Sequence, residues 1–376
     1  MNFLIACGGT AGHINPAIAI AEEIRARLPK SKILFVGAGK PLENRLIPAA
    51  GFHLVNIRMS GLRRSVSLED LLYNAGTVRN LVTAGVKAEK LLVRFSPAVV
   101  IGTGGYICYP ILKKAAQIGI PTIIHGSDAV PGLTTKLLST AVDKVLVSFP
   151  GLEHLYRRPE RVVFTGTPVR EGFEAAAMLS EKSGKDADQN KLPKLLSFWG
   201  SQGAERMNES ISEMIACNIK NIRFDHLHAT GKSESSVMKT RLERLGITDK
   251  LPQGIQVREY IDDMPSVMAD ADLVLCRAGA STIAELTVLG KPAILVPSPY
   301  VTNNHQEANA KQLQKSGGAE VISEKDSSGE RLYNEVSALI TDKEKLLRMS
   351  YAQKSLATPK ATQRIVDIVF EMAGLS

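Results

Sequence analysis

No apolar run in this sequence is long enough to cross a lipid bilayer. The 376 residues are 44% hydrophobic with a mean hydropathy of -0.01, and no apolar stretch approaches the ~20 residues that a membrane-spanning helix needs. The first residues, MNFLIACGGT, run directly into an apolar strand. They do not show the charged segment, apolar segment and cleavage site of a signal peptide. We therefore expect the chain to stay in the cytosol.

Cysteine is scarce, and its placement argues against disulfide bonds and against a cysteine metal site. The four cysteines, Cys7, Cys108, Cys217 and Cys276, lie far apart and form no C-x-x-C pair. Cys7 and Cys276 each end an apolar run, where a thiol behaves as a small buried hydrophobic group. This spacing favours buried free thiols over a disulfide framework or a cysteine metal site.

No motif of a nucleic-acid-binding fold is present, although the formal net charge is +8. Residues 1–165 hold 20 of the 46 Lys and Arg but only 10 of the 38 Asp and Glu, so the whole positive excess lies in this half. A basic half fits nucleic acid, an anionic membrane surface or an acidic substrate. Because the basic residues alternate with apolar ones, we expect no nucleic-acid partner.

Basic residues are densest in residues 60–94, among apolar residues at helical spacing. The basic side chains of this stretch are Arg63, Arg64, Arg79, Lys87, Lys90 and Arg94. One interpretation is an amphipathic helix that packs on a sheet and leaves its basic side in water. The other is an interfacial surface that contacts anionic lipid.

Short β-rich runs alternate with helical segments along the chain, which is typical of a parallel, doubly wound α/β sheet. The alternation stops near residue 165, crosses a hydrophilic stretch and then restarts. A chain of this length also exceeds a single core. We therefore predict two Rossmann-like α/β domains facing a cleft, residues 1–165 and residues 166–358. A last helix at about residues 359–376 is expected to pack back on the first domain.

Three glycine-rich turns follow predicted strands: residues 8–13 (GGTAGH), 102–110 (GTGGYICYP) and 200–204 (GSQGA). The first matches neither G-x-G-x-x-G nor a P-loop with lysine. We expect a helix to begin only at about Pro16, which leaves His13 in the turn. His13 is then either an ordinary hydrogen-bonded surface residue or, at the carboxyl end of a strand, a residue that faces the cleft.

Residues 273–310 carry the strongest local signal. A strand ends near Cys276 and a turn of small residues leads into a helix start, where free N–H groups and the helix dipole favour an anion. Thr282 and Glu285 match a T-x-x-E capping box, which is the purely structural interpretation. The loop after the next strand holds Asn303, Asn304, His305, Gln306 and Asn309. We find no packing reason for so many amides, and such groups suit the hydroxyls of a ribose and a sugar.

Eight motifs in order, spread over nearly the whole chain, resemble one family. They are GGTAGHINPA, GTGGYICYP, TGTPVR, GSQGA, HATG, YIDDM, CRAGASTIAEL and NNHQEANA. Together they are similar to the MurG family, inverting glycosyltransferases of GT-B fold. These enzymes move N-acetylglucosamine from UDP-GlcNAc to the muramyl sugar of lipid I, an undecaprenyl-diphosphate-linked acceptor, and make lipid II for peptidoglycan.

The resemblance implies a set of contacts. Those assigned to the sugar donor are Thr10, Ala11, Gly12, Asp128, Arg170, Ser201, Ile261, Ala280, Ser281, Thr282, Ile283, Ala284, Glu285 and Gln306. Those assigned to the acceptor side are Gly104, Gly105 and Tyr106, with the turn at residues 10–13 beside them. Within the first set, Ile261 meets uracil through its backbone, Glu285 the ribose diol and Gln306 the GlcNAc hydroxyls. The resemblance also implies a peripheral protein on the cytoplasmic face of the cell membrane, with an anionic membrane surface and a cell-wall synthesis complex as partners.

The implied reaction is a single displacement that needs a base for the acceptor C4 hydroxyl and stabilisation of the departing diphosphate. His13 is our candidate base because histidine titrates near working pH, and Asp128 is its rival. Arg170 and the helix start at residues 280–282 are expected to take the leaving-group charge. The loops that carry these motifs contain no D-x-D pair, so we expect catalysis with no metal and no cofactor.

The sequence departs from the family pattern at four positions. Ala11 and Trp199 stand where the family has glycine, Gly126 where it has glutamate, and Asp128 where it has asparagine. Three other functions therefore stay open. These are a UDP-sugar transferase acting on another lipid such as a diacylglycerol, a catalytically weak paralogue that binds or scaffolds, and a nucleotide-sugar epimerase.

Overall fold

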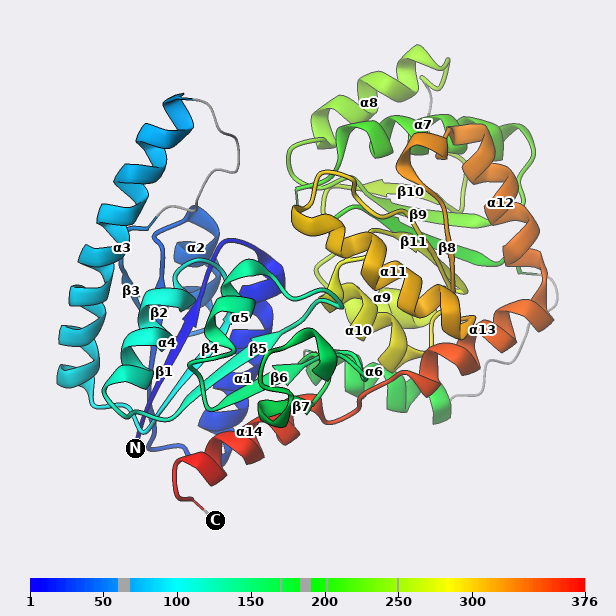
Figure 1. Ribbon diagram of the computed structural model, residues 1–376. Helices are drawn as coiled ribbons and strands as arrows, with labels where there is room; N and C mark the ends of the chain where they lie inside the picture. The colour runs from blue at the N-terminus through cyan, green and yellow to red at the C-terminus, as the bar shows by residue number, and fades with distance from the viewer. Residues whose placement is uncertain (60–67, 170, 183–190, 201, 249, 376) are drawn as a thin grey trace. The chain divides into compact units, whose positions relative to one another are not determined.

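The computed structural model describes residues 1–59, 68–169, 171–182, 191–200, 202–248 and 250–375 (Figure 1). The chain divides into two compact units, Met1–Arg170 with Lys360–Ser376, and Glu171–Pro359. Each unit is a parallel sheet with helices between consecutive strands, so the prediction of two doubly wound α/β domains is confirmed. That the domains face a cleft stays a prediction.

The first unit is built on a seven-stranded sheet of order β3-β2-β1-β4-β5-β6-β7, with parallel neighbours throughout. Its strands are β1 (Asn2–Cys7), β2 (Lys32–Gly37), β3 (His53–Asn56), β4 (Val99–Gly104), β5 (Thr122–Gly126), β6 (Lys144–Val147) and β7 (Val162–Phe164). Its helices are α1 (Ala11–Arg27), α2 (Pro41–Ala49), α3 (Leu68–Phe95), α4 (Cys108–Gln117), α5 (Leu133–Leu138) and α14 (Ala361–Met372), with short 3-10 turns at Glu153–Leu155 and Pro159–Arg161. The chain order therefore reverses between β1 and β4, which in open α/β sheets is the point where ligands bind.

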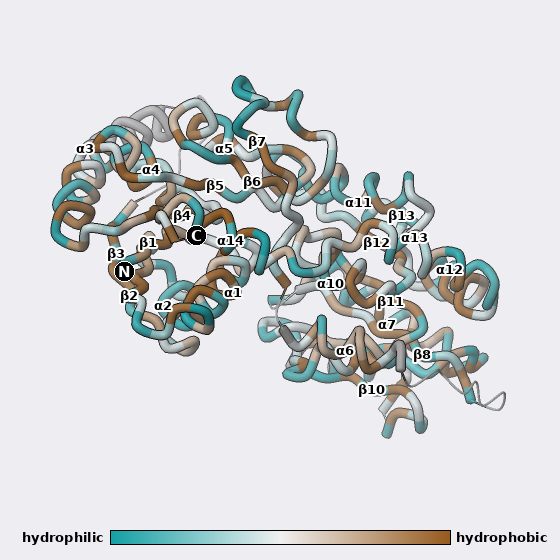
Figure 2. Tube along the Cα trace, turned by 90° about the horizontal axis from the view of Figure 1, so that it is seen from below, coloured by the Kyte–Doolittle hydropathy of each residue, from teal (hydrophilic) through white to brown (hydrophobic). Residues whose placement is uncertain are grey.

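The last helix completes the core of the first unit. Ile365, Val366 and Val369 of α14 are fully buried in the same cluster as residues of β1 and α1, and the Phe3 and Phe370 ring centroids lie 6.1 Å apart. Figure 2 shows hydrophobic stretches on both α1 and α14. The final helix is thus part of the first fold, even though the whole second unit separates the two in sequence.

The second unit has a six-stranded parallel sheet of order β10-β9-β8-β11-β12-β13. Its strands are β8 (Lys194–Phe198), β9 (Asp225–Ala229), β10 (Ile255–Arg258), β11 (Leu273–Cys276), β12 (Ala293–Leu295) and β13 (Ala319–Val321). Its helices are α6 (Glu171–Lys182), α7 (Glu205–Lys220), α8 (Ser235–Arg244), α9 (Met264–Asp270), α10 (Ala280–Leu289), α11 (His305–Ser316), α12 (Gly329–Thr341) and α13 (Lys343–Ser355), with 3-10 turns at Thr302–Asn304 and Glu324–Asp326. In its core, α7 and α12 pack against Leu195 of β8 and Leu273 and Leu275 of β11.

The boundary between the units falls five residues beyond the one expected from the sequence. The N–H groups of Thr165 and Gly166 both donate to the Val147 carbonyl of β6. His125 Nε2, at the end of β5, lies 3.0 Å from the Gly166 carbonyl oxygen. These bonds attach the TGTPVR loop to the first sheet, so the first unit extends to residue 170.

Other expectations are met in part. Cys7, Cys108 and Cys276 are buried free thiols, whereas Cys217 is only partly buried. Burial raises the pKa of Cys108 to about 12, which makes its thiol inert at neutral pH. Among the described residues, no helix is both long and apolar enough to span a membrane.

Candidate functional site

His13 lies in the first turn of α1, not in the turn before it. The helix begins at Ala11 with Thr10 as its N-cap, so our expected start at Pro16 was five residues late. Proline cannot donate a helix hydrogen bond, but its φ suits a helix, and α1 continues through Pro16. The early start fixes the imidazole beside the glycine turn.

The contacts of His13 define which ring nitrogen can act as a base. His13 Nδ1 lies 2.9 Å from the Gly8 carbonyl oxygen. Because a carbonyl oxygen only accepts, Nδ1 must carry the proton and donate it. In the neutral ring, Nε2 then holds the basic lone pair. The His13 carbonyl accepts a hydrogen bond of 2.7 Å from the Thr103 hydroxyl, which ties α1 to β4.

The second glycine turn packs directly against this histidine. A Cβ atom on Gly104, whose φ is +122°, would lie 2.3 Å from His13 Cδ2, and one on Gly105 would lie 2.5 Å from the Gly8 carbonyl oxygen. Only glycine therefore allows the two turns to meet so closely. Tyr106 follows with 55% of its surface exposed. The structure brings residues 8–13 and 104–106 together, because β1 and β4 are neighbours in the sheet.

A buried carboxylate that the sequence analysis missed holds the first turn. Glu43 of α2 is fully buried, and its side chain accepts from the N–H groups of Gly9 at 2.9 Å, Gly39 at 2.8 Å and Lys40 at 3.0 Å. A Cβ on Gly8 would lie 2.5 Å from Glu43 Oε1. Pro41 and Glu43, at the first and third positions of α2, are typical of a helix start, where Glu43 accepts from the N-cap Lys40. Nothing in the sequence shows that the same carboxylate also binds the Gly9 N–H of another turn.

His125, near the end of β5, and Asp128, in the loop that follows, both belong to the surroundings of His13. Burial lowers the pKa of His125 to about 4; its bond to the Gly166 carbonyl and the Asp128 carboxylate oppose the shift, while His13 adds to it. His125 is therefore neutral at pH 7. Asp128 is half-buried in the following loop, so both candidate bases and His125 belong to one electrostatic neighbourhood.

In the second unit, the start of α10 differs from a capping box. The N-cap is Gly279, which places Thr282 and Glu285 inside the helix; the capping-box interpretation is wrong because the small residues before Thr282 let the helix begin earlier. Ser281 Oγ is buried and has no hydrogen-bond partner among the residues that the structure describes. A buried hydroxyl beside the positive end of a helix dipole suits an anionic ligand oxygen.

The remaining residues of this helix start play different parts. Ile283 and Ala284 are buried at 3% and 9% exposure, as is Ala280 at 8%. Glu285 is half-buried one turn further along. Ile261, in the loop after β10, is 4% exposed. That these residues contact a ligand stays a prediction.

The sequence analysis did not predict the ion pair that lies directly before the turn leading into α10. Arg277, at the end of β11, pairs with the buried Glu324 at 2.6 Å and donates to the Val296 carbonyl at 3.1 Å. Its guanidinium carbon lies 5.6 Å from the centroid of the Trp199 ring. Arg277 thus connects the carboxyl ends of several strands directly before the turn at residues 278–280.

The amides of residues 303–309 have structural roles that we did not expect. Asn303 and Asn304 adopt φ of 57° and 51°, a left-handed conformation that asparagine tolerates. Asn309 is fully buried and donates to the Ala278 carbonyl at 3.2 Å. Gln306 Oε1 accepts from the Ser298 N–H at 2.9 Å. Our statement that packing does not explain these amides is therefore wrong for Asn303, Asn304 and Asn309.

Two predicted site residues, Arg170 and Ser201, lie outside the described residues. Across the part of the chain that the structure describes, no group of three or more His, Cys, Asp or Glu side chains is arranged to hold a metal ion. His226 and His228 share a face of β9. Both bond to the Ser197 hydroxyl in the core, at 2.7 and 2.8 Å.

Comparison with known proteins agrees with this arrangement. Residues 3–147 match the glycosyltransferase family 28 N-terminal domain and residues 195–365 its C-terminal domain. A UDP-N-acetylglucosamine–N-acetylmuramyl-(pentapeptide) pyrophosphoryl-undecaprenol N-acetylglucosamine transferase of Acetivibrio thermocellus is 41% identical, over 98% of this chain and 97% of its own. A Bacillus cereus transferase of the same description is 38% identical over 98% of both chains.

Solved structures give the same fold. The crystal structure of Acinetobacter baumannii MurG has a TM-score of 0.75 at 26% identity and covers 99% of this chain and 100% of its own. A Neisseria meningitidis UDP-GlcNAc 2-epimerase, with a TM-score of 0.67 at 14% identity over 99% and 100%, shares the fold alone. With both domains matched and near-full-length identity of about 40% to curated relatives, the chain belongs to glycosyltransferase family 28, among the UDP-N-acetylglucosamine–N-acetylmuramyl-(pentapeptide) pyrophosphoryl-undecaprenol N-acetylglucosamine transferases.

Proposed function

We propose that this transferase moves N-acetylglucosamine from UDP-GlcNAc to the C4 hydroxyl of the muramyl sugar of lipid I. The product is β-1,4-linked lipid II for peptidoglycan. The reaction is one in-line displacement at the anomeric carbon, with inversion and with UDP as the leaving group. The observation that carries the proposal is the α10 start. There the Ser281 hydroxyl is buried at the positive end of a helix and has no hydrogen-bond partner within the described part of the chain.

The sugar donor binds the second unit in this proposal. The first-turn N–H groups of α10 and the Ser281 hydroxyl meet the diphosphate, together with Arg170 and Ser201. Glu285 accepts from the ribose hydroxyls, and the backbone of Ile261 contacts uracil. The Ser298 N–H engages Gln306 Oε1, so the amide NH₂ of Gln306 is the group that remains to donate to a GlcNAc hydroxyl.

The acceptor binds the glycine turns of the first unit, and His13 is the base. Its Nδ1 donates to the Gly8 carbonyl at 2.9 Å, which supports a tautomer with the lone pair on Nε2. That nitrogen removes the proton from the C4 hydroxyl as the new bond forms. Asp128 is the alternative base, and a neutral His125 adds no positive charge that would oppose proton uptake.

The acceptor is lipid-linked, so the chain must work at a membrane surface. We propose that α3 contacts the cytoplasmic face of the membrane as a peripheral element. Val86 and Val93, seven residues apart, are 51% and 68% exposed, and Lys90 and Arg94 beside them are exposed as well. Apolar and basic side chains together on one exposed helix are typical of binding to anionic lipid.

The test measures UDP release from UDP-GlcNAc with and without a soluble lipid I analogue, in EDTA, for the native chain and His13→Ala. We expect acceptor-dependent release that survives EDTA. In the variant, kcat should fall about 10²- to 10⁴-fold with unchanged UDP affinity, because His13 does not contact the nucleotide. Release without acceptor would favour an epimerase, and tight UDP binding without any release would favour the non-catalytic paralogue.

A further inference from the structure

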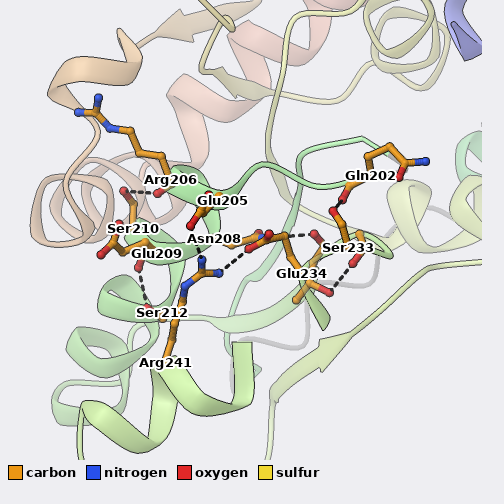
Figure 3. Close-up of polar contacts among 12 residues, drawn as sticks. Gln202, Glu205, Arg206, Asn208, Glu209, Ser210, Ser212, Ser233, Glu234 and Arg241 are labelled. Atoms are coloured by element: carbon orange, nitrogen blue, oxygen red, sulfur yellow. Dashed lines mark hydrogen bonds and ion pairs between the residues drawn. The ribbon is translucent and has the colours of Figure 1, made fainter. Parts of the chain in front are cut away.

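Two turns at the carboxyl edge of the second sheet interlock. A Cβ on Gly203, after β8, would lie 2.1 Å from the Thr230 carbonyl oxygen. One on Gly231, after β9, would lie 2.2 Å from the Gly203 nitrogen. The Ser233 N–H donates to the Gln202 carbonyl at 3.4 Å, and the Ser233 hydroxyl donates to the same oxygen (Figure 3). Neither turn can shift without moving the other.

The turn at residues 230–234 is also attached to the strand on its other side. The Thr230 N–H donates to the Arg258 carbonyl at 2.9 Å, and the Gly231 N–H donates to the Glu259 carbonyl at 3.0 Å. Ile261, the proposed uracil contact, follows two residues after Glu259. This turn therefore connects the turn at residues 200–204, on the proposed diphosphate side, with the segment proposed to bind the base.

A largely buried ion pair holds that connecting turn. Arg241, on α8, lies with its Nη1 2.7 Å from Glu234 Oε2, and the two side chains are only 12% and 14% exposed. Arg241 Nη2 lies 3.9 Å from Glu205 Oε1 at the start of α7, where the carboxylate is 83% exposed. Figure 3 shows Arg241 reaching both carboxylates across the two turns.

Because this ion pair is largely buried, removing one partner should disturb the surrounding turns. Exposed ion pairs contribute little, whereas removing one partner of a buried pair leaves an uncompensated charge that the structure must move to solvate. A Cβ on Gly203 would lie 3.3 Å from Glu234 Cγ, so the Glu234 side chain lies directly beside the neighbouring turn.

We propose that Arg241 and Glu234 are positioning residues for the sugar-donor site. Their pair fixes the turns at residues 202–204 and 230–234, and so sets the spacing between the diphosphate and uracil contacts. This inference rests on the proposed function of the second unit. Neither side chain contacts the nucleotide in this account.

The experiment compares Glu234→Gln, which keeps the shape but removes the charge, with Arg241→Lys, which keeps the charge but loses the forked geometry. The control is Glu243→Gln on the same helix. Its partner Lys239 lies 4.0 Å away, and the two side chains are 84% and 47% exposed for Lys239 and Glu243. Titration calorimetry gives the Kd for UDP, steady-state kinetics give the KM for UDP-GlcNAc and for a lipid I analogue, and thermal scans give each Tm.

We expect Glu234→Gln to raise the Kd for UDP and the KM for UDP-GlcNAc about tenfold, because misplacement of contact groups far from the chemistry is costly. The KM for the acceptor analogue should not change. Arg241→Lys should raise the same two constants, but less than Glu234→Gln does, because it keeps the charge. The control should have the same Kd and KM values as the native chain. If Glu234→Gln does not fold, the partial loss of UDP affinity expected in Arg241→Lys decides the matter.

Unchanged UDP binding in both variants, or equal changes in the KM for both substrates, would overturn the positioning role. A native chain that shows no UDP binding would instead contradict the proposed donor site itself. The two failures are therefore distinguishable in the same titrations.

Discussion

At Gly104 a single methyl group would meet the proposed base. The added Cβ would lie 2.3 Å from His13 Cδ2 and 2.7 Å from its Nε2, so Gly104→Ala must displace the imidazole. We expect kcat to fall about 10²-fold, because that is a common cost of moving a reacting group by about 1 Å. UDP affinity, measured by calorimetry, should stay as in the native chain.

The control for this change is Gly119→Ala. Gly119 has φ of +77° and no atom within 4 Å of an added Cβ, so this variant carries backbone strain of about 1–2 kcal/mol without a clash at the site. Equal kcat losses in both variants would show that strain in the first unit, and not the position of His13, limits the reaction.

His125 makes the first unit sensitive to acid. Its folded pKa is about 4, below the ordinary value of 6.5, because burial disfavours the charged ring. Protonation therefore favours the unfolded chain. The neutral His125 therefore stabilises the folded chain fully above pH 6.5, and this stabilisation is lost as the pH falls from 6.5 towards 4. Between pH 7 and pH 5 the loss lowers the unfolding free energy by about 2 kcal/mol.

We test this with His125→Gln, whose amide can still donate to the Gly166 carbonyl but does not titrate. Urea unfolding followed by far-UV circular dichroism should show a smaller loss between pH 7 and pH 5 in the variant than in the native chain. Burial also lowers the pKa values of His226 and His228. Both are present in the native chain and in the variant, so their effect cancels when the two losses of unfolding free energy are compared. Identical pH dependence would contradict a neutral, buried His125.

Residues at this scale differ in how far the sequence predicts them. The glycines of residues 102–110 and His13 stand in recognisable motifs, so their neighbourhood could be predicted. The contact of Glu43 with the Gly9 N–H and the pairing of Arg277 with Glu324 could not be predicted, because these partners are distant in sequence. A side chain whose role is to support other segments leaves no local pattern.

At the scale of elements, α14 belongs to the first unit and should matter to its stability. Ile365 is fully buried between α14 and the first sheet. Ile365→Ala should lower the unfolding free energy of this unit by about 2–5 kcal/mol, the usual cost of deleting so many buried methylene groups. Circular dichroism follows both units, whereas Trp199, the single tryptophan, reports on the second.

Asp367→Ala on the same helix is the matched control. Its carboxylate pairs with Arg27 at 2.5 Å but is 65% exposed, so its loss should cost less than about 1 kcal/mol. If the two variants unfold alike, or if only the Trp199 transition shifts, α14 does not stabilise the first unit in the way described.

The strength of the sequence signal for a strand depends on its position in the sheet. β3 and β13 are edge strands; both are short and partly exposed. An edge strand has one pairing neighbour and needs no continuous apolar run. The central strands β1, β4 and β11 are buried and apolar, so their sequences predict a strand more clearly.

At the scale of the whole molecule, the positive charge of residues 1–165 predicts salt-sensitive binding to anionic vesicles. Val93→Glu places a negative charge on the exposed apolar side of α3. It should weaken vesicle binding about tenfold or more, since it removes an exposed apolar side chain that would enter the lipid and it opposes the surface potential. Sedimentation with phosphatidylglycerol vesicles at 50 and 300 mM salt measures the salt dependence of binding and the effect of the substitution.

Leu347→Glu in α13 is the control, because Leu347 is 57% exposed on the second unit. The native chain should bind less at the higher salt concentration, since mobile ions screen the attraction. Equal weakening in both variants, or binding without salt dependence, would contradict a membrane contact through α3.

The sequence by itself determined the two α/β domains, the order of their glycine turns and the family, because apolar periodicity and strand-turn-helix motifs are local patterns that chain order preserves. The tertiary structure decided which groups meet there. It set the tautomer of His13 through Gly8, the support of the first turn by Glu43, and the structural roles of Asn303, Asn304 and Asn309. These depend on how the folded turns meet in three dimensions, as where the Gly9 N–H binds Glu43 and where Asn309 reaches the Ala278 carbonyl. Hydropathy periodicity along the chain does not encode such contacts.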